Sequence, residues 1–148
     1  MTFVIHGFFS FLASTMFGII FNSPRNRLLH CGFVGAVGWL VYLASRDLLL
    51  DGDAVKASFL GAFAVAIVAH LFSKRYRTPM IIFSVAGIIP LVPGGKAYNT
   101  MRNVMEKHYD EATIYAMEVL MISGSIAMGL VFAEVIIQLI FKKRTAAK

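Results

Sequence analysis

Long apolar runs alternate with short polar segments along this chain, and most of the runs are long enough to cross a bilayer. A transmembrane helix needs about 20 apolar residues, with a range of about 17–25. We expect five spans, at about Phe3–Phe21, Leu28–Ala44, Ala54–Phe72, Pro79–Val92 and Ala112–Phe141. The second run is marginal in length and the fourth is short. The pattern predicts an all-α integral membrane protein, with residues 1–148 forming a single transmembrane domain.

The fourth run is interrupted where a helix should still be continuing. Pro90 and Pro93 fall inside it, and Gly94 and Gly95 follow at once. Proline removes a backbone donor and clashes with the preceding turn, and glycine adds backbone freedom. Irregular backbone at membrane depth is tolerated only where protein or a water-filled cavity satisfies its polar groups. Broken helices of this kind indicate the binding site of a transporter.

The loop charges predict one orientation. Basic residues without any acid occupy three segments, at 25–27, 74–77 and 142–148, whereas the other connecting segments are close to neutral. Because cytoplasmic loops are enriched in Lys and Arg, we expect the N-terminus outside, the C-terminus inside and the break near the outer end of the fourth span. The N-terminus lacks the cationic region of a signal peptide, so we expect the first span to be retained.

Composition narrows the function classes. Hydrophobic residues make up 58% of the chain and charged residues only 15%, which is unlike a soluble domain. Cys31 is the single cysteine, so no internal disulfide, Cys/His metal site or cofactor is predicted. The net charge of +6 lies in short membrane-flanking clusters, which argues against nucleic acid as a partner. No nucleophile–base pair or phosphate loop appears, so we predict no catalytic residues and no enzyme.

The broken segment is the first candidate for binding chemistry. A helix resuming after Gly95 would direct its N-terminal amides at an anionic group, and Lys96 would add a cation. The predicted substrate-binding residues are Pro90, Pro93, Gly94, Gly95, Tyr98 and Asn99. The alternative is that Pro-Gly-Gly only ends a short helix and starts an outer loop. The segment 96–111 is either an amphipathic helix of its own or an extension of the fifth span.

Glu134 and His70 are the second candidate. Counting from Lys142 at 1.5 Å per residue, Glu134 lies about 12 Å inside the bilayer. An intramembrane carboxylate is costly, so Glu134 is predicted to couple protons or, alternatively, to bond a neighbouring helix. His70 could relay protons or only pack at a helix interface. Glu118 falls at or beyond the outer interface, where we expect it to be solvated.

Small residues recur at helical spacing and predict close helix contacts. Such stripes are Ser125, Gly129 and Ala133; Ala62 and Ala66, continued by His70; and Gly32 with Ala36.

Two motifs resemble the threonine/serine exporter family, in particular its small, separate membrane subunit. Residues 21–29 read FNSPRNRLL, and residues 88–101 read IIPLVPGGKAYNTM, which is similar to the family's I-P-x-x-P-G-x-x-A-Y run. The motif positions are Pro90, Pro93, Gly94 and Tyr98. The resemblance implies a larger partner subunit with its own membrane helices. Some members of the family export threonine and serine, and a two-component member exports succinate.

Together these features predict the small subunit of a secondary exporter, located in the bacterial inner membrane and driven by a proton or ion gradient. Its substrate is expected to be a small carboxylate-bearing metabolite, either an amino acid or a dicarboxylate, and its surroundings the lipid bilayer. One alternative is a membrane scaffold that does not transport. Another is a membrane-embedded enzyme that uses Glu134 and His70, which requires the two side chains to meet.

Overall fold

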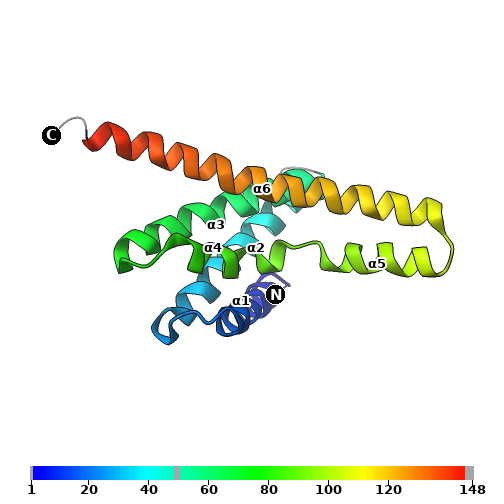
Figure 1. Ribbon diagram of the computed structural model, residues 1–148, viewed down its shortest axis with the longest axis horizontal. Coiled ribbons are helices and arrows are strands. Elements are labelled where there is room, and N and C mark those ends of the chain that lie inside the picture. Colours follow the sequence, from blue (N-terminus) through cyan, green and yellow to red (C-terminus); the bar gives the residue numbers. More distant parts are fainter. Residues whose placement is uncertain (1, 49–50, 146–148) are drawn as a thin grey trace.

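The described part of the chain consists of helices joined by short turns. The computed structural model describes residues 2–48 and 51–145, with side chains described over 3–48 and 51–140. The elements are α1 (Thr2–Ile20), η1 (Arg25–Arg27), α2 (Leu28–Leu48), α3 (Ala54–Tyr76), α4 (Met80–Ile88), η2 (Ile89–Leu91), α5 (Gly94–Met105) and α6 (Tyr109–Thr145) (Figure 1). No strand occurs in these residues, so the predicted all-α fold is confirmed.

Four helices, α1, α2, α3 and α6, are long and apolar enough to cross a membrane. A fifth span is obtained if α4 with η2 and α5 are counted together as one bent crossing. The long helices exceed the predicted spans mainly at their polar ends: α2 continues to Leu48, α3 to Tyr76 and α6 from Tyr109 to Thr145. Apolarity sets the part that lies in lipid, whereas helical hydrogen bonding continues beyond it.

Neighbouring helices pack in the directions that alternate crossing requires. The first two are antiparallel, because Gly7 near the start of α1 lies against Leu40 of α2, and Gly18 near its end lies against Cys31. The helices α3 and α6 run in the same direction. Ser125 Oγ donates to the carbonyl of Val55 at 2.5 Å, and one turn further Gly129 packs on Ala62. The small-residue stripes predicted on α3 and α6 therefore meet, whereas Gly32 of the third stripe lies against Thr15 and Phe11 of α1.

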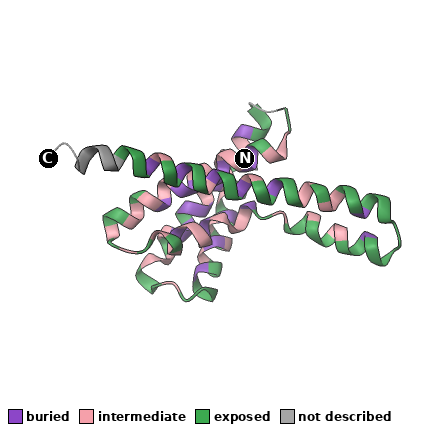
Figure 2. Cartoon of the chain, turned by 45° about the horizontal axis from the view of Figure 1, so that its top comes forward, coloured by how far each residue is buried: buried purple, intermediate pink, exposed green. Residues whose placement is uncertain are grey.

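The core lies where α2, α3 and α4 cross. Buried residues gather there, and the ends of the helices are exposed (Figure 2). Glycine permits the close approach: a Cβ on Gly61 of α3 would lie 3.0 Å from the carbonyl oxygen of Gly38 on α2. A Cβ on Gly87 of α4 would lie 2.5 Å from Val34 Cγ1. Van der Waals packing of small residues drives helix association in lipid, so these glycines hold the bundle together.

Two ends of the bundle differ in charge. The basic end carries η1 and the turn after α3, and Arg77 ends α3 in a left-handed conformation with φ of 51°. The other end, which we name the mixed-charge end, carries the turn between α2 and α3. There the Asp53 carboxylate caps α3, since Oδ1 accepts from the amides of Val55 at 3.0 Å and Lys56 at 3.2 Å.

The helix that begins at Met80 is interrupted near Pro90 and Pro93. After nine residues α4 gives way to the 3-10 turn η2, and α5 begins at Gly94 with a bend of 54°. Leu91, inside the break, is only 4% exposed and belongs to the core. The irregular backbone is therefore sheltered by protein at the point where it leaves the helix.

The segment 96–111 forms a separate helix for most of its length. Residues 94–105 make α5, and a turn at Glu106–His108 leads into α6. The helix α5 lies beside the first part of α6, and the two project as a hairpin away from the other helices (Figure 1). At 1.5 Å per residue, the 37 residues of α6 measure about 55 Å, nearly twice the hydrocarbon thickness of a bilayer.

Candidate functional site

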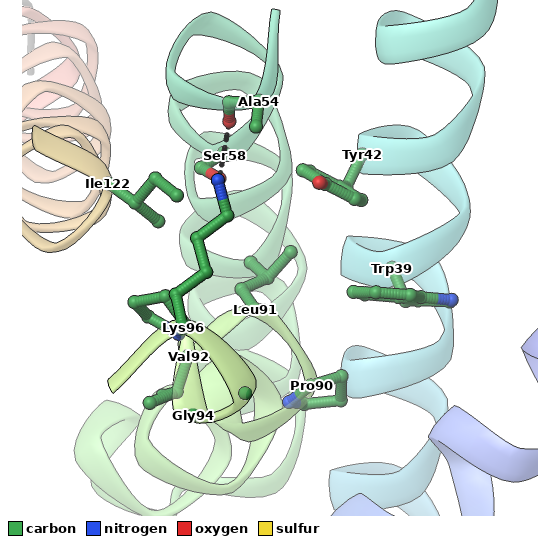
Figure 3. A pocket seen from close by; sticks show the side chains of 12 residues that line it. Trp39, Tyr42, Ala54, Ser58, Pro90, Leu91, Val92, Gly94, Lys96 and Ile122 are labelled. Carbon is green, nitrogen blue, oxygen red and sulfur yellow. Dashed lines mark hydrogen bonds between the residues drawn. The ribbon is translucent and has the colours of Figure 1, made fainter. Parts of the chain in front are cut away.

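A pocket of about 200 Å³ lies directly at the break, near the mixed-charge end. Its lining combines the broken segment with α2, α3 and α6 (Figure 3). The lining residues are Trp39, Tyr42, Ala54, Ser58, Pro90, Leu91, Val92, Pro93, Gly94, Gly95, Lys96 and Ile122. Ligand pockets usually measure about 300–1,000 Å³, so this one suits a metabolite of few atoms.

Two aromatic rings from α2 form one wall of the pocket. Trp39 and Tyr42 stack with their ring centroids 5.0 Å apart, and Figure 3 shows both projecting from α2. The hydroxyl of Ser58 on α3 donates a hydrogen bond to the carbonyl of Ala54 at 2.7 Å, so the hydroxyl proton is not available to a ligand. The hydroxyl oxygen can still accept a hydrogen bond from a ligand. The wall is thus mainly apolar with a few polar groups, which is typical of a small-molecule site.

The glycines at the start of α5 face open space. A Cβ on either Gly94 or Gly95 would meet no atom within 4 Å. Neither glycine has a positive φ, so backbone conformation does not require glycine there. At the helix crossing, in contrast, glycine is required by the backbone and side chains of its neighbours. Among the described residues, nothing occupies the space where a Cβ of residue 94 or 95 would lie, which leaves room for a ligand to approach the first turn of α5.

Lys96 is paired within the chain. Its Nζ lies 2.5 Å from Oε2 of Glu118 on α6, and the two side chains are 37% and 43% exposed. Glu118 is partly exposed, as expected, but it also pairs with Lys96, because the α5–α6 hairpin brings the carboxylate to the lysine. The pocket rim therefore carries an ion pair with no net charge, where the sequence predicted a cation.

The predicted binding residues divide into three groups. Pro90, Pro93, Gly94 and Gly95 line the pocket. Tyr98 is 66% exposed and lies outside the lining, and Asn99 lines a separate polar recess between α5 and α6. The recess is lined by Asn99, Arg102, Asn103, Glu106, His108, Glu111 and Tyr115.

Trp39, Tyr42 and Ser58 were not predicted. The one available signal was that Trp39 is the single tryptophan of the chain. This signal is weak, because aromatic residues are common in membrane proteins without binding a ligand.

Neither His70 nor Glu134 lines the pocket at the break. Glu134 on α6 interacts electrostatically with His70 on α3. His70 follows Ser58 by twelve residues on the same helix, which places it about 18 Å along α3 towards the basic end. The Glu134 side chain is exposed, and its Oε1 accepts a hydrogen bond from the side-chain amide of Gln138 at 3.4 Å. In the described residues, no three His, Cys, Asp or Glu side chains gather as metal ligands.

These features define the class of protein: a multi-pass helical membrane protein in which an interrupted helix lines a small pocket. Such a helix is characteristic of secondary transporters. The profile of the family described as "Threonine/Serine exporter, ThrE" matches residues 6–136. The chain belongs to the threonine/serine exporter family.

A distant relative extends the comparison. The chain is 30% identical over 103 residues to an uncharacterized protein of Haemophilus influenzae. The match includes 68% of this chain and 33% of the relative, so the chain spans well under half the length of that protein. No solved structure matches the chain.

Proposed function

We propose that this chain is the small subunit of a secondary exporter, and that the pocket at the break holds a small carboxylate-bearing metabolite. The observation that carries the proposal is the break between α4 and α5: Leu91 is buried in the core, and three residues later the open glycines of α5 begin to line a cavity. The partial positive charge at the start of α5 favours a carboxylate there. Membership of an exporter family supports the direction of transport.

The charge of the pocket rim favours an amino acid over a dicarboxylate. Lys96 can bond a carboxylate, and Glu118 beside it can bond an ammonium group. The stacked rings of Trp39 and Tyr42 also attract a cation. A zwitterion such as threonine or serine matches both charges of this pair. A dicarboxylate such as succinate would bring two negative charges to a rim whose cation is already neutralised.

In this proposal the chain acts together with a larger partner subunit in the bacterial inner membrane. Glu134 and Gln138 are exposed on a membrane-crossing helix, where polar groups facing lipid are costly. A second set of membrane helices that covers this part of α6 would remove that cost. With the basic end assigned to the cytoplasm, this chain has its N-terminus outside and would complement a half of opposite orientation.

Proton coupling is assigned to Glu134 and His70 in the same proposal. The two side chains interact electrostatically and lie towards the basic end, so they would exchange protons with the cytoplasmic side. Their separation from the pocket implies that protonation acts through movement of α6 against α3 and not by direct contact with the substrate.

An efflux assay tests the proposal. The chain is co-expressed with the larger subunit, and vesicles are loaded with labelled threonine, serine or succinate. Gly95→Leu should abolish efflux at normal abundance, because Gly95 lines the pocket and a Cβ there would meet no protein atom within 4 Å. Gly124→Leu is the matched control, since Gly124 also meets no atom within 4 Å but lies outside the pocket lining.

Efflux at the wild-type rate by Gly95→Leu would refute the site. The alternative function is a scaffold that assembles another membrane protein. It predicts that efflux by any variant follows only the amount of complex in the membrane.

A further inference from the structure

A second recess lies at the basic end, distant from the pocket at the break. It has a volume of about 410 Å³ and opens between α1, α2 and α3. Its lining is almost entirely aromatic or aliphatic: Phe11, Leu29, His30, Phe33, Phe72 and Tyr76. Leu29 and Phe33 are 67% and 51% exposed, so the recess is open at the side of the bundle, where lipid acyl chains lie.

The polar end of this recess is a connected group of three side chains. His30 Nε2 lies 2.7 Å from the hydroxyl oxygen of Tyr76, and the Arg27 guanidinium lies 4.2 Å from the centre of the Tyr76 ring. His30 Nδ1 is buried and has no hydrogen-bond partner among the described residues. In the tautomer protonated at Nε2, the ring donates to Tyr76 and leaves the tyrosine proton free to donate elsewhere. Arg27 and Tyr76 are then adjacent donors.

The surrounding charge is strongly positive. The eight acidic residues of the chain are at positions 47, 51, 53, 106, 110, 111, 118 and 134, and none lies within the segments 25–27 or 74–77. Arg27 forms no ion pair with the described residues, and Arg75 also lies over the Tyr76 ring, at 5.8 Å. An anion is therefore the chemical complement of this end of the recess.

We propose that this recess binds one anionic phospholipid. The phosphate would accept hydrogen bonds from Arg27 and Tyr76, and an acyl chain would lie against Phe33, Phe72 and Phe11. The apolar length of the recess favours a lipid over a free anion, which would use only its polar end. Basic pockets between membrane helices bind anionic head groups in this manner. The assignment is independent of the exported substrate.

Native mass spectrometry of the full chain, extracted from membranes in mild detergent, tests this site. Phosphatidylglycerol or phosphatidylcholine of equal chain length is added, and bound lipid is counted. We expect one phosphatidylglycerol per chain, bound several-fold more tightly than phosphatidylcholine. Arg27→Gln should weaken phosphatidylglycerol binding about fivefold, the effect of one membrane-surface cation. Arg46→Gln at the mixed-charge end is the matched control and should bind as the wild type does.

Tyr76→Phe separates recognition from packing. It keeps the ring that contacts Arg27 and removes only the hydroxyl, so the preference for phosphatidylglycerol over phosphatidylcholine should fall about two- to threefold with unchanged thermal unfolding. Equal binding of the two lipids by the wild type, or equal phosphatidylglycerol binding by Arg27→Gln and Arg46→Gln, would overturn the proposal. Displacement of the lipid by millimolar inorganic phosphate would also overturn it, because that result defines a free-anion site.

Discussion

Glycine has opposite roles in two regions of this protein. Where the helices cross, glycines are surrounded: a Cβ on Gly129 would lie 2.6 Å from the carbonyl oxygen of Phe59, and one on Gly61 would lie 3.0 Å from that of Gly38. At the break, Gly94 and Gly95 have nothing within 4 Å. In the first region glycine is explained by the packing of the chain itself. In the second it is not.

This difference in surroundings distinguishes glycines that are needed for helix packing from glycines that are not. A glycine that packs against backbone cannot be replaced without moving a helix, because backbone atoms cannot rotate away as a side chain can. A glycine beside empty space costs conformational entropy on folding and gains no contact in return. Under the proposed function, a glycine of this kind at the pocket lets a molecule approach the backbone there. The predictions below test this contrast, from the largest expected effect to the smallest.

The largest effect is expected from Gly129→Ala. The new methyl group must push α6 away from the Phe59 carbonyl of α3, and overpacking of this kind costs about 1–3 kcal/mol. The free energy of unfolding in detergent, measured by thermal or denaturant titration, should fall by that amount. Gly124→Ala, on the same helix beside open space, is the control and should not destabilise the protein. Equal losses for both variants would contradict the packing explanation.

An alanine at the break should raise the free energy of unfolding, whereas Gly129→Ala should lower it. Gly95→Ala is compatible with the observed backbone and should stabilise the fold by about 0.4–1 kcal/mol, because it restricts the unfolded chain. Efflux should fall at the same time if the substrate approaches the backbone at Gly95, which lines the pocket. A variant that is both more stable and fully active would show that the space at Gly95 serves no ligand.

The Lys96–Glu118 pair should contribute little to stability. Both side chains are more than a third exposed, so a double-mutant cycle of Lys96→Ala and Glu118→Ala should give a coupling of about 0.2–1 kcal/mol. In efflux assays, each single variant should weaken amino-acid export much more than this coupling implies. If the efflux of both variants falls only in proportion to their stability, the pair is structural.

The smallest effect concerns the cap of α3. The side chain of Lys56, followed by its amide, holds the pKa of Asp53 below its usual range. The carboxylate cap is therefore fully present above the ordinary aspartate pKa of about 3.9 and is lost as the pH falls through the lower folded value. Asp53→Asn also caps a helix but does not titrate there, so it should lack this component of acid destabilisation. The same acid profile for both proteins would contradict this assignment.

Much of the fold was predictable because the helices and the break are determined by residues that are close together in the sequence. Run length identified the membrane-crossing helices, and two prolines with two glycines identified the break, since both effects arise within a few residues. The pocket was only partly predictable. Trp39 reaches it from a helix fifty residues earlier, and only tertiary packing brings the two together.

Tyr98 shows the limit of reasoning from a motif. It lies four residues after Gly94, on the same face of α5, but the 54° bend carries the second turn of that helix away from the pocket. The pairing of Glu118 depends on the same bend, because α5 then lies along α6 and not in line with α4. Neither the angle of a broken helix nor its neighbour is encoded in the residues that break it.

Substrate protection of a cysteine at position 95 tests the binding site most directly. Cys31 is fully buried, so the native thiol gives little background with a membrane-impermeant maleimide. A Gly95→Cys variant in the assembled exporter should react from outside the cell, and saturating threonine or serine should slow that reaction, whereas labelling of a Gly124→Cys control should not change. Labelling of Gly95→Cys at the same rate with and without every candidate substrate would contradict a site at the break.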